Sequence, residues 1–169
     1  TIGGIRDYSS NAELLKSLAN IDDIEVNFVG KGPSAPLLKD YCIRNCINNV
    51  YFEGYYPKEK EKDYIQQSTY LNIYYPKIIS HSTALSNRFY NSLIYRKPMI
   101  VTSNSIQGYY VEKYSLGLSI NDCKDLDIKL RAYLKSEEYK RFNENCRTLL
   151  GEFVKDYQIF EGVLMSFIN

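Results

Sequence analysis

Short apolar runs alternate with amphipathic stretches along most of the chain. Apolar runs of about four to eight residues are typical of buried strands, and apolar residues three or four positions apart are typical of helices. On this basis we expect strands at residues 2–5, 24–29, 50–54, 70–75, 98–101 and 117–120. Strands that alternate with helices form parallel sheets. The pattern therefore predicts an α/β fold, a doubly wound, Rossmann-like parallel sheet of about six strands with helices on both faces.

The stretches between these strands carry signals of helix starts. Ser10 and Glu13 form a capping box for a helix that runs to about Ala19, and Ser34 is placed to cap a helix over 35–45. The alternating charges of residues 58–63 indicate the solvated face of a third helix. A further helix is expected over 107–114.

The chain becomes fully helical near Asp125. We expect one helix lined by Leu126, Leu130 and Leu134, a second over 137–154 and a third over 157–168. With 169 residues, 44% of them hydrophobic, the chain suits one domain over 1–169, with about 125–169 as its helical C-terminal segment.

Residues 86–101 predict a short helix that leads into a buried strand. Ser86 or Asn87 caps its start, and a lysine-proline pair ends it before the strand at 98–101. Its apolar residues share one face at helical spacing: Phe89, Leu93 and Ile94. The helix start offers unpaired N–H groups and the positive end of the helix dipole. With Arg88 in the first turn, we expect it to seat a phosphate group.

Ligands of doubly wound folds bind outside the carboxyl ends of the strands. Candidate residues follow four of the expected strands at this edge: Arg6; Gly30, Lys31 and Gly32; Tyr55; and His81, Ser82, Asn87 and Arg88. Each has a plainer explanation beside it. An ordinary strand-to-helix turn accounts equally well for the two glycines, and His81 and both arginines have the alternative of being surface residues.

Charge and cysteine content narrow the class of protein. The net charge of +1 gives no reason to expect nucleic acid or an anionic membrane as a partner. The chain has four cysteines, no CxxC pair and one histidine, so we expect reduced, packed thiols and no metal site. With neither a signal peptide nor an apolar run of about 20 residues, we expect a soluble, cytoplasmic protein. The opening residues read as the tail of a strand, as in an excised fragment.

Three motifs, in this order and at this spacing, resemble those of a known family. Residues 28–33, FVGKGP, are similar to its F-V-G-x-G-P, and residues 50–55, VYFEGY, match its V-x-F-x-G element. Residues 87–91 with 97–100 resemble its N-K-x-Y-E … G-K-P-V-I block. The family is that of the GT-B fold glycosyltransferases, family-4-like and of the bacterial surface-polysaccharide type. The chain resembles their C-terminal, nucleotide-sugar-binding half.

The resemblance implies a function for the parent protein. It would transfer a sugar from a nucleotide-sugar donor to a glycan or lipid-linked acceptor, in capsule, lipopolysaccharide or exopolysaccharide synthesis. The chain lacks a metal-binding Asp-x-Asp motif, so transfer without metal or other cofactor is implied. The catalytic residue would lie in an N-terminal domain of the same protein, which is the expected partner. The chain alone would bind donor weakly and transfer nothing, and the full-length enzyme would be cytoplasmic, with at most peripheral association at the inner face of the membrane.

The resemblance also implies roles for single residues. The loop from Gly30 to Gly32 and Tyr55 would border the base and ribose, and the loop with His81 and Ser82 would hold diphosphate and sugar with the helix start at Asn87. Arg6 and Arg88 would contact the diphosphate, where charge develops on the leaving group. Alignment on Pro98 places Asn91 where many members have a glutamate that contacts the ribose.

Three other functions remain open from the sequence. A nucleotide-sugar epimerase shares the fold but needs an acid and a base near the sugar. A receiver-like domain would show acidic residues after its first and third strands, and Gly54 stands at the latter place. A non-catalytic nucleotide-binding or interaction domain would keep the fold without the reaction.

Overall fold

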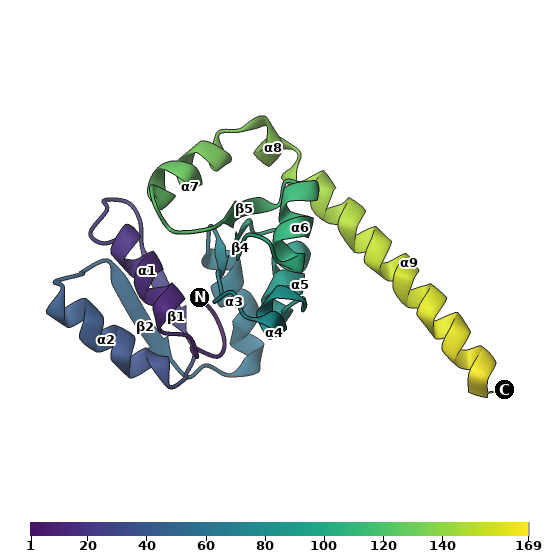
Figure 1. Cartoon of the computed structure of the whole chain (residues 1–169), viewed down its shortest axis with the longest axis horizontal. Helices are drawn as coiled ribbons and strands as arrows, with labels where there is room; N and C mark the ends of the chain where they lie inside the picture. The colour runs from purple at the N-terminus through teal and green to yellow at the C-terminus, as the bar shows by residue number, and fades with distance from the viewer. Residues whose placement is uncertain (169) are drawn as a thin grey trace.

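The computed structural model describes residues 1–168, which form an alternating series of strands and helices (Figure 1). The strands are β1 (Val26–Val29), β2 (Val50–Gly54), β3 (Leu71–Ile73), β4 (Met99–Thr102) and β5 (Gly117–Ile120). The helices before β4 are α1 (Ser9–Ser17), α2 (Ser34–Arg44), α3 (Glu61–Gln67), α4 (Ile79–Ser82) and α5 (Asn87–Tyr95), with a 3₁₀ turn η1 (Lys58–Lys60). The later helices are α6 (Ile106–Lys113), α7 (Leu126–Leu134), α8 (Glu137–Lys140) and α9 (Phe142–Ile168).

All strand pairs are parallel, which confirms the α/β class. The strands form two sheets, one of β1 and β2 and one in the order β3-β4-β5, where we expected a single sheet of about six strands. Residues 2–5 contribute only one bridge, between Ile2 and Val29. Two features keep this segment out of a ladder with β3. Gly3 has φ of 92°, far from extended backbone. The Arg88 guanidinium donates hydrogen bonds to the carbonyl oxygens of Ile2 and Gly4, which are then not available to β3.

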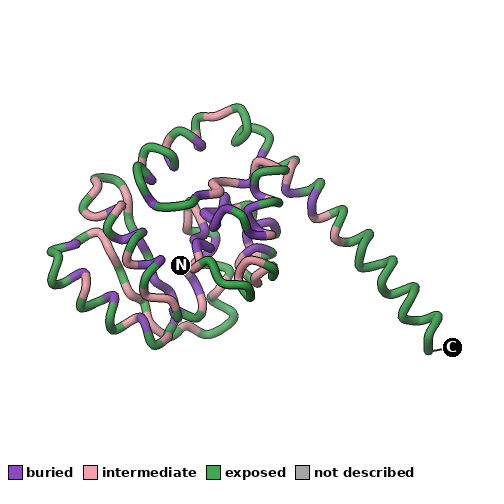
Figure 2. The backbone as a smooth tube through the Cα atoms, viewed as in Figure 1, coloured by how far each residue is buried: buried purple, intermediate pink, exposed green. Residues whose placement is uncertain are grey.

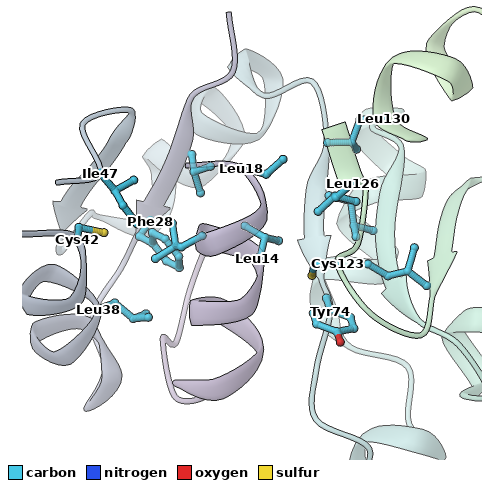
Figure 3. Close-up of a cluster of buried hydrophobic side chains, with 14 of the residues drawn as sticks. Leu14, Leu18, Phe28, Leu38, Cys42, Ile47, Tyr74, Cys123, Leu126 and Leu130 are labelled. Atoms are coloured by element: carbon cyan, nitrogen blue, oxygen red, sulfur yellow. The ribbon is translucent and has the colours of Figure 1, made fainter. Parts of the chain in front are cut away.

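Helices cover both faces of the sheets, and the core divides accordingly (Figures 2 and 3). One buried cluster joins α1, α2 and α7 to the strands and includes Phe28 and Leu126. Leu14 of α1 lies between these two parts of the cluster (Figure 3). A second cluster joins α5, α6 and the start of α9 to β3 and β4, and a third, smaller cluster contains Ile65 of α3.

The C-terminal segment differs from the three helices we expected. After α7 there is one short helix, α8, and then the 27 residues of α9 form a single helix across the expected break at 154–157. The residues there include neither glycine nor proline, so nothing stops the helix. Phe142, Cys146 and Leu149 are buried and Leu150 and Phe153 pack against the second cluster, whereas α9 after Phe153 projects away from the body with its side chains exposed (Figures 1 and 2).

Two helix starts are built differently from our expectation. The capping box of α1 is absent: the N–H of Ser10 donates to the Asp7 carboxylate at 2.8 Å, and Glu13 instead accepts from the Tyr74 hydroxyl at 2.9 Å. At α2, Ser34 is itself the first helical residue, and its hydroxyl donates to the Arg6 carbonyl oxygen at 2.7 Å. The side chains of Glu13 and Ser34 therefore make tertiary contacts and do not cap the helices.

All four cysteines are free thiols, and three of them are buried: Cys42, Cys123 and Cys146. Cys46 is exposed and lies beyond the end of α2 with φ of 52°, so the expectation of packed thiols is wrong for this residue. Burial raises the pKa of the Cys123 and Cys146 thiols to about 12, so these side chains pack as apolar groups.

Candidate functional site

A cleft of about 380 Å³ lies at the carboxyl ends of the strands. The turn at residues 2–7, the start of α1, residues 56–61, Tyr75, His81 and the first turns of α5 line it. This is the edge at which ligands of parallel α/β folds bind. Of the ten residues expected at the site, the cleft brings together these: Arg6, His81, Asn87, Arg88 and Asn91.

The α5 helix presents its amino end to the cleft. Ser86 caps it, as one of our two alternatives predicts, by accepting the Phe89 N–H at 3.3 Å. The N–H groups of Asn87 and Arg88 precede the first bonded turn and have no partner within the helix. Phe89 and Leu93 are buried as expected, but Ile94 is 56% exposed, which corrects our assignment of that residue to the apolar face.

Arg88 reaches across the cleft floor from α5 to the N-terminal segment. It donates from Nε to the Ile2 carbonyl oxygen, from Nη2 to that of Gly4 at 2.9 Å and from Nη1 to that of Asn72 at 3.4 Å. Burial lowers the pKa of Arg88 from its ordinary value. Within residues 1–168 it forms no ion pair, so a half-buried cation faces the cleft without a carboxylate partner.

Arg6 is the second cation of the rim. Its side chain is exposed and, in the part of the chain that the structure describes, makes neither a hydrogen bond nor an ion pair. The Ser34 hydroxyl fixes the backbone of Arg6, while the guanidinium is free to turn toward a ligand. An exposed cation and a half-buried one in the same cleft suit an anion that carries more than one charge.

Asn91 holds a carboxylate that the sequence did not reveal. Its Nδ2 donates to Glu61 Oε1 at 3.0 Å, while Glu61 Oε2 accepts from the Tyr56 hydroxyl at 2.9 Å and pairs with Lys58 Nζ at 2.7 Å. Burial opposes the charge on Glu61, but the three donors outweigh it and hold the pKa of that carboxyl below its usual value. Burial, followed by the bond to Glu61, raises the pKa of Tyr56 to about 12, so the phenol stays protonated.

His81 lies against the Tyr75 ring, with the ring centroids 5.0 Å apart. Its Nδ1 is buried and lacks a hydrogen-bond partner among the described residues. The guanidinium of Arg88 also lies over the Tyr75 ring, 5.6 Å from the ring centroid. The side chains of His81 and Arg88 therefore both pack against the Tyr75 ring.

The remaining expected residues do not line the cleft. Lys31 and Tyr55 are exposed beyond it, with Lys31 Nζ 5.3 Å from the centre of the Tyr55 ring, and Ser82 lies at the end of α4. The two glycines have a packing reason: a Cβ on Gly30 or on Gly32 would come within about 2 Å of a backbone oxygen, at 2.0 and 2.1 Å respectively. They allow the loop after β1 to pass directly against residues 3–5.

Sequence reasoning missed several residues that line the cleft, among them Tyr56, Glu61 and Tyr75. Glu61 belongs to the alternating charge run that we assigned to a solvated face, and its side chain is only 17% exposed. The spacing of charges carries no signal that tells one buried member of such a run from the exposed ones. Only the packing of α3 against α5 brings Glu61 to Asn91.

Residues 1–168 contain no group of three or more His, Cys, Asp or Glu side chains placed to hold a metal ion. Over the same range, none of the helices combines the length and apolarity required to cross a bilayer. Comparison of the sequence with models of known protein families and with curated proteins finds no match.

Proposed function

We propose that the cleft binds the diphosphate of a nucleotide sugar, and that the chain is the donor-binding half of a glycosyltransferase. The observation that carries this proposal is the pair Arg6 and Arg88 at the open start of α5. Both cations lack a carboxylate partner among residues 1–168, and unpaired N–H groups of the helix point at the same space. Cations and a helix amino end are the groups that stabilise a departing diphosphate in the absence of metal.

The carboxylate of Glu61 supports the same proposal. The family resemblance asks for a glutamate against the donor ribose at the position of Asn91, and Asn91 instead holds Glu61 beside it at 3.0 Å. A carboxylate bonds sugar hydroxyls more strongly than an amide does. In this proposal Glu61 takes the ribose, with Asn91 as its support.

In this proposal Tyr55 and Lys31, which lie outside the cleft, contact the nucleotide base of the donor. Tyr55 is 72% exposed, and it directly precedes Tyr56 of the cleft wall. An exposed ring beside the cleft offers a face for stacking, and Lys31 lies over that ring at 5.3 Å from its centre. A base placed there would leave the ribose near Glu61 and the diphosphate near Arg88.

Calorimetric titration with UDP, GDP and their sugars tests the proposal. We expect weak binding of at least one of them, and Arg6→Ala to weaken it about tenfold to a hundredfold, the value of one charge-assisted hydrogen bond. Arg147→Ala is the matched control, because Arg147 is exposed on α9, which is outside the cleft walls. Absence of heat with every ligand, or equal loss in both variants, would refute the assignment.

A further inference from the structure

A second cavity, of about 510 Å³, opens between β1 and β3 at the opposite edge from the cleft. We call it the slot. Residues 23–27 form one wall and residues 67–72 the other, and leucines of α1 and α7 lie on one side: Leu14, Leu18, Leu130 and Leu134. Both walls lead into the amino-terminal end of a strand, residues 23–27 into β1 and residues 67–72 into β3. The two strands therefore run in the same direction along the slot.

The edge of β1 toward the slot begins a parallel ladder. Val29 N–H donates to the Thr1 carbonyl oxygen at 2.8 Å, and the Thr1 amino nitrogen donates to the Asn27 carbonyl oxygen at 2.7 Å. Val26 N–H bonds to Asn49 on the β2 side, so the alternation of a strand turns the N–H of Asn27 into the slot. An open N–H at a strand edge is a site for pairing with further backbone.

The edge of β3 faces the slot from the other side. Leu71 N–H bonds to Pro98 at 2.9 Å on the β4 side, so the main chain of Asn72 is turned toward the slot. The Asn72 side chain donates to Thr1 Oγ1 at 2.8 Å. Thr1 thus touches both walls, and Figure 1 shows the N-terminus between the two sheets. Because Thr1 bonds to both Asn27 and Asn72, one extended segment bridges the two walls at this level.

The surroundings of the Thr1 amino group disfavour a positive charge on it. The residue is half-buried beside Arg88, and burial, followed by the charge of Arg88, lowers the pKa of the amino group to about 5. An amide at the same nitrogen would carry no charge and would keep the hydrogen bond to Asn27. The position therefore fits a peptide nitrogen within a strand better than an ammonium group.

We propose that the slot holds an extended segment of polypeptide joined to Thr1, which runs parallel to β1 and β3 and unites the two sheets into one. The shorter wall, residues 23–27, is five residues long, or about 16 Å of strand. Continuing the register of Ile2 with Val29, the second and fourth residues before Thr1 face the leucines of α1 and α7, so these two are apolar. The first and third face the side of Asn27, which is exposed, so these two are polar.

N-terminal extensions of the full chain test the proposal. The in-register extension places Val-Thr-Ile-Thr before Thr1, and the control, Thr-Val-Thr-Ile, has the same composition with its apolar residues on the other face. A Gly-Ser-Gly-Ser extension serves as the unstructured reference. We expect the in-register extension alone to raise the midpoint of thermal unfolding by at least about 4 °C. We also expect it to slow hydrogen exchange of the Asn27 amide at least about tenfold.

Equal midpoints for the three extensions, with unchanged exchange at Asn27, would overturn the proposal. An in-register extension that lowers the midpoint or aggregates while the Gly-Ser-Gly-Ser chain stays folded would overturn it as well. Equal stabilisation by the Val-Thr-Ile-Thr and the Thr-Val-Thr-Ile extensions would show nonspecific apolar contact and would overturn the defined register.

Discussion

Replacing Arg88 by alanine tests whether this residue is first of all a clamp. Its three hydrogen bonds tie Ile2, Gly4 and Asn72 together, and each bond from a charged donor contributes about 1.5–3 kcal/mol. The sum is an upper bound, because the Gly4 carbonyl regains water and the cost of burying the guanidinium disappears. A net loss of about 2–3 kcal/mol remains, which lowers the unfolding midpoint of a domain of this size by about 5–10 °C.

Thermal unfolding followed by far-ultraviolet circular dichroism measures this loss. Arg6→Ala is the matched control, since it removes a cation from the same cleft whose side chain makes no hydrogen bond within residues 1–168, and we expect a shift of about 1 °C or less. Arg88→Lys keeps the charge but not the planar fork of donors, so we expect it to lower the unfolding midpoint nearly as much as Arg88→Ala does. A midpoint of Arg88→Ala within about 2 °C of the unmodified protein, or full rescue by lysine, would refute the clamp.

Three further predictions concern packing and charge. Gly30→Ala places a Cβ 2.0 Å from the Gly3 oxygen and should destabilise by at least about 3 kcal/mol in urea unfolding, whereas Gly54→Ala, with open space and φ of 70°, should cost about 1 kcal/mol; equal costs would contradict the close approach. Phe28→Ala should cost about 3–5 kcal/mol in the same assay, and a cost below 1 would contradict its full burial. The lowered pKa of Glu61 contributes stability above about pH 4.3 that is lost as the pH falls through the folded value, so the stability difference between the protein and Glu61→Gln should shrink from pH 7 to pH 3. A difference that does not change with pH would contradict the paired carboxylate.

The order of strands and helices followed from the hydrophobic pattern because that pattern reflects local burial. The bounds of β2 and β5 agree with the expected 50–54 and 117–120, and the start of α5 agrees with the cap at Ser86. The single six-stranded sheet was wrong in detail, since the carbonyl groups of Ile2 and Gly4 accept hydrogen bonds from Arg88 and residues 2–5 do not pair with β3. That choice is made by a side chain 86 residues away, which no local pattern describes.

The candidate site was predictable only in part, for the same reason. Topology places every loop after a strand at one edge, so Arg6, His81 and Arg88 could be expected to meet there. The pairing of Asn91 with Glu61 depends on how α3 packs against α5, and the charge run around Glu61 looks solvated in sequence. Lys31 was placed at the right edge, but the distance between loops that separates it from the cleft is a property of the folded chain.

The long-range bond from Arg88 to Ile2 has a consequence for the order of folding. The two residues are separated by 86 positions, so loop closure of that length must precede the contact. We therefore expect the bonds from Arg88 to Ile2 and Gly4 to form late, after the transition state. Stopped-flow kinetics of Arg88→Ala should then show faster unfolding with a nearly unchanged folding rate, because contacts formed late act on the unfolding limb.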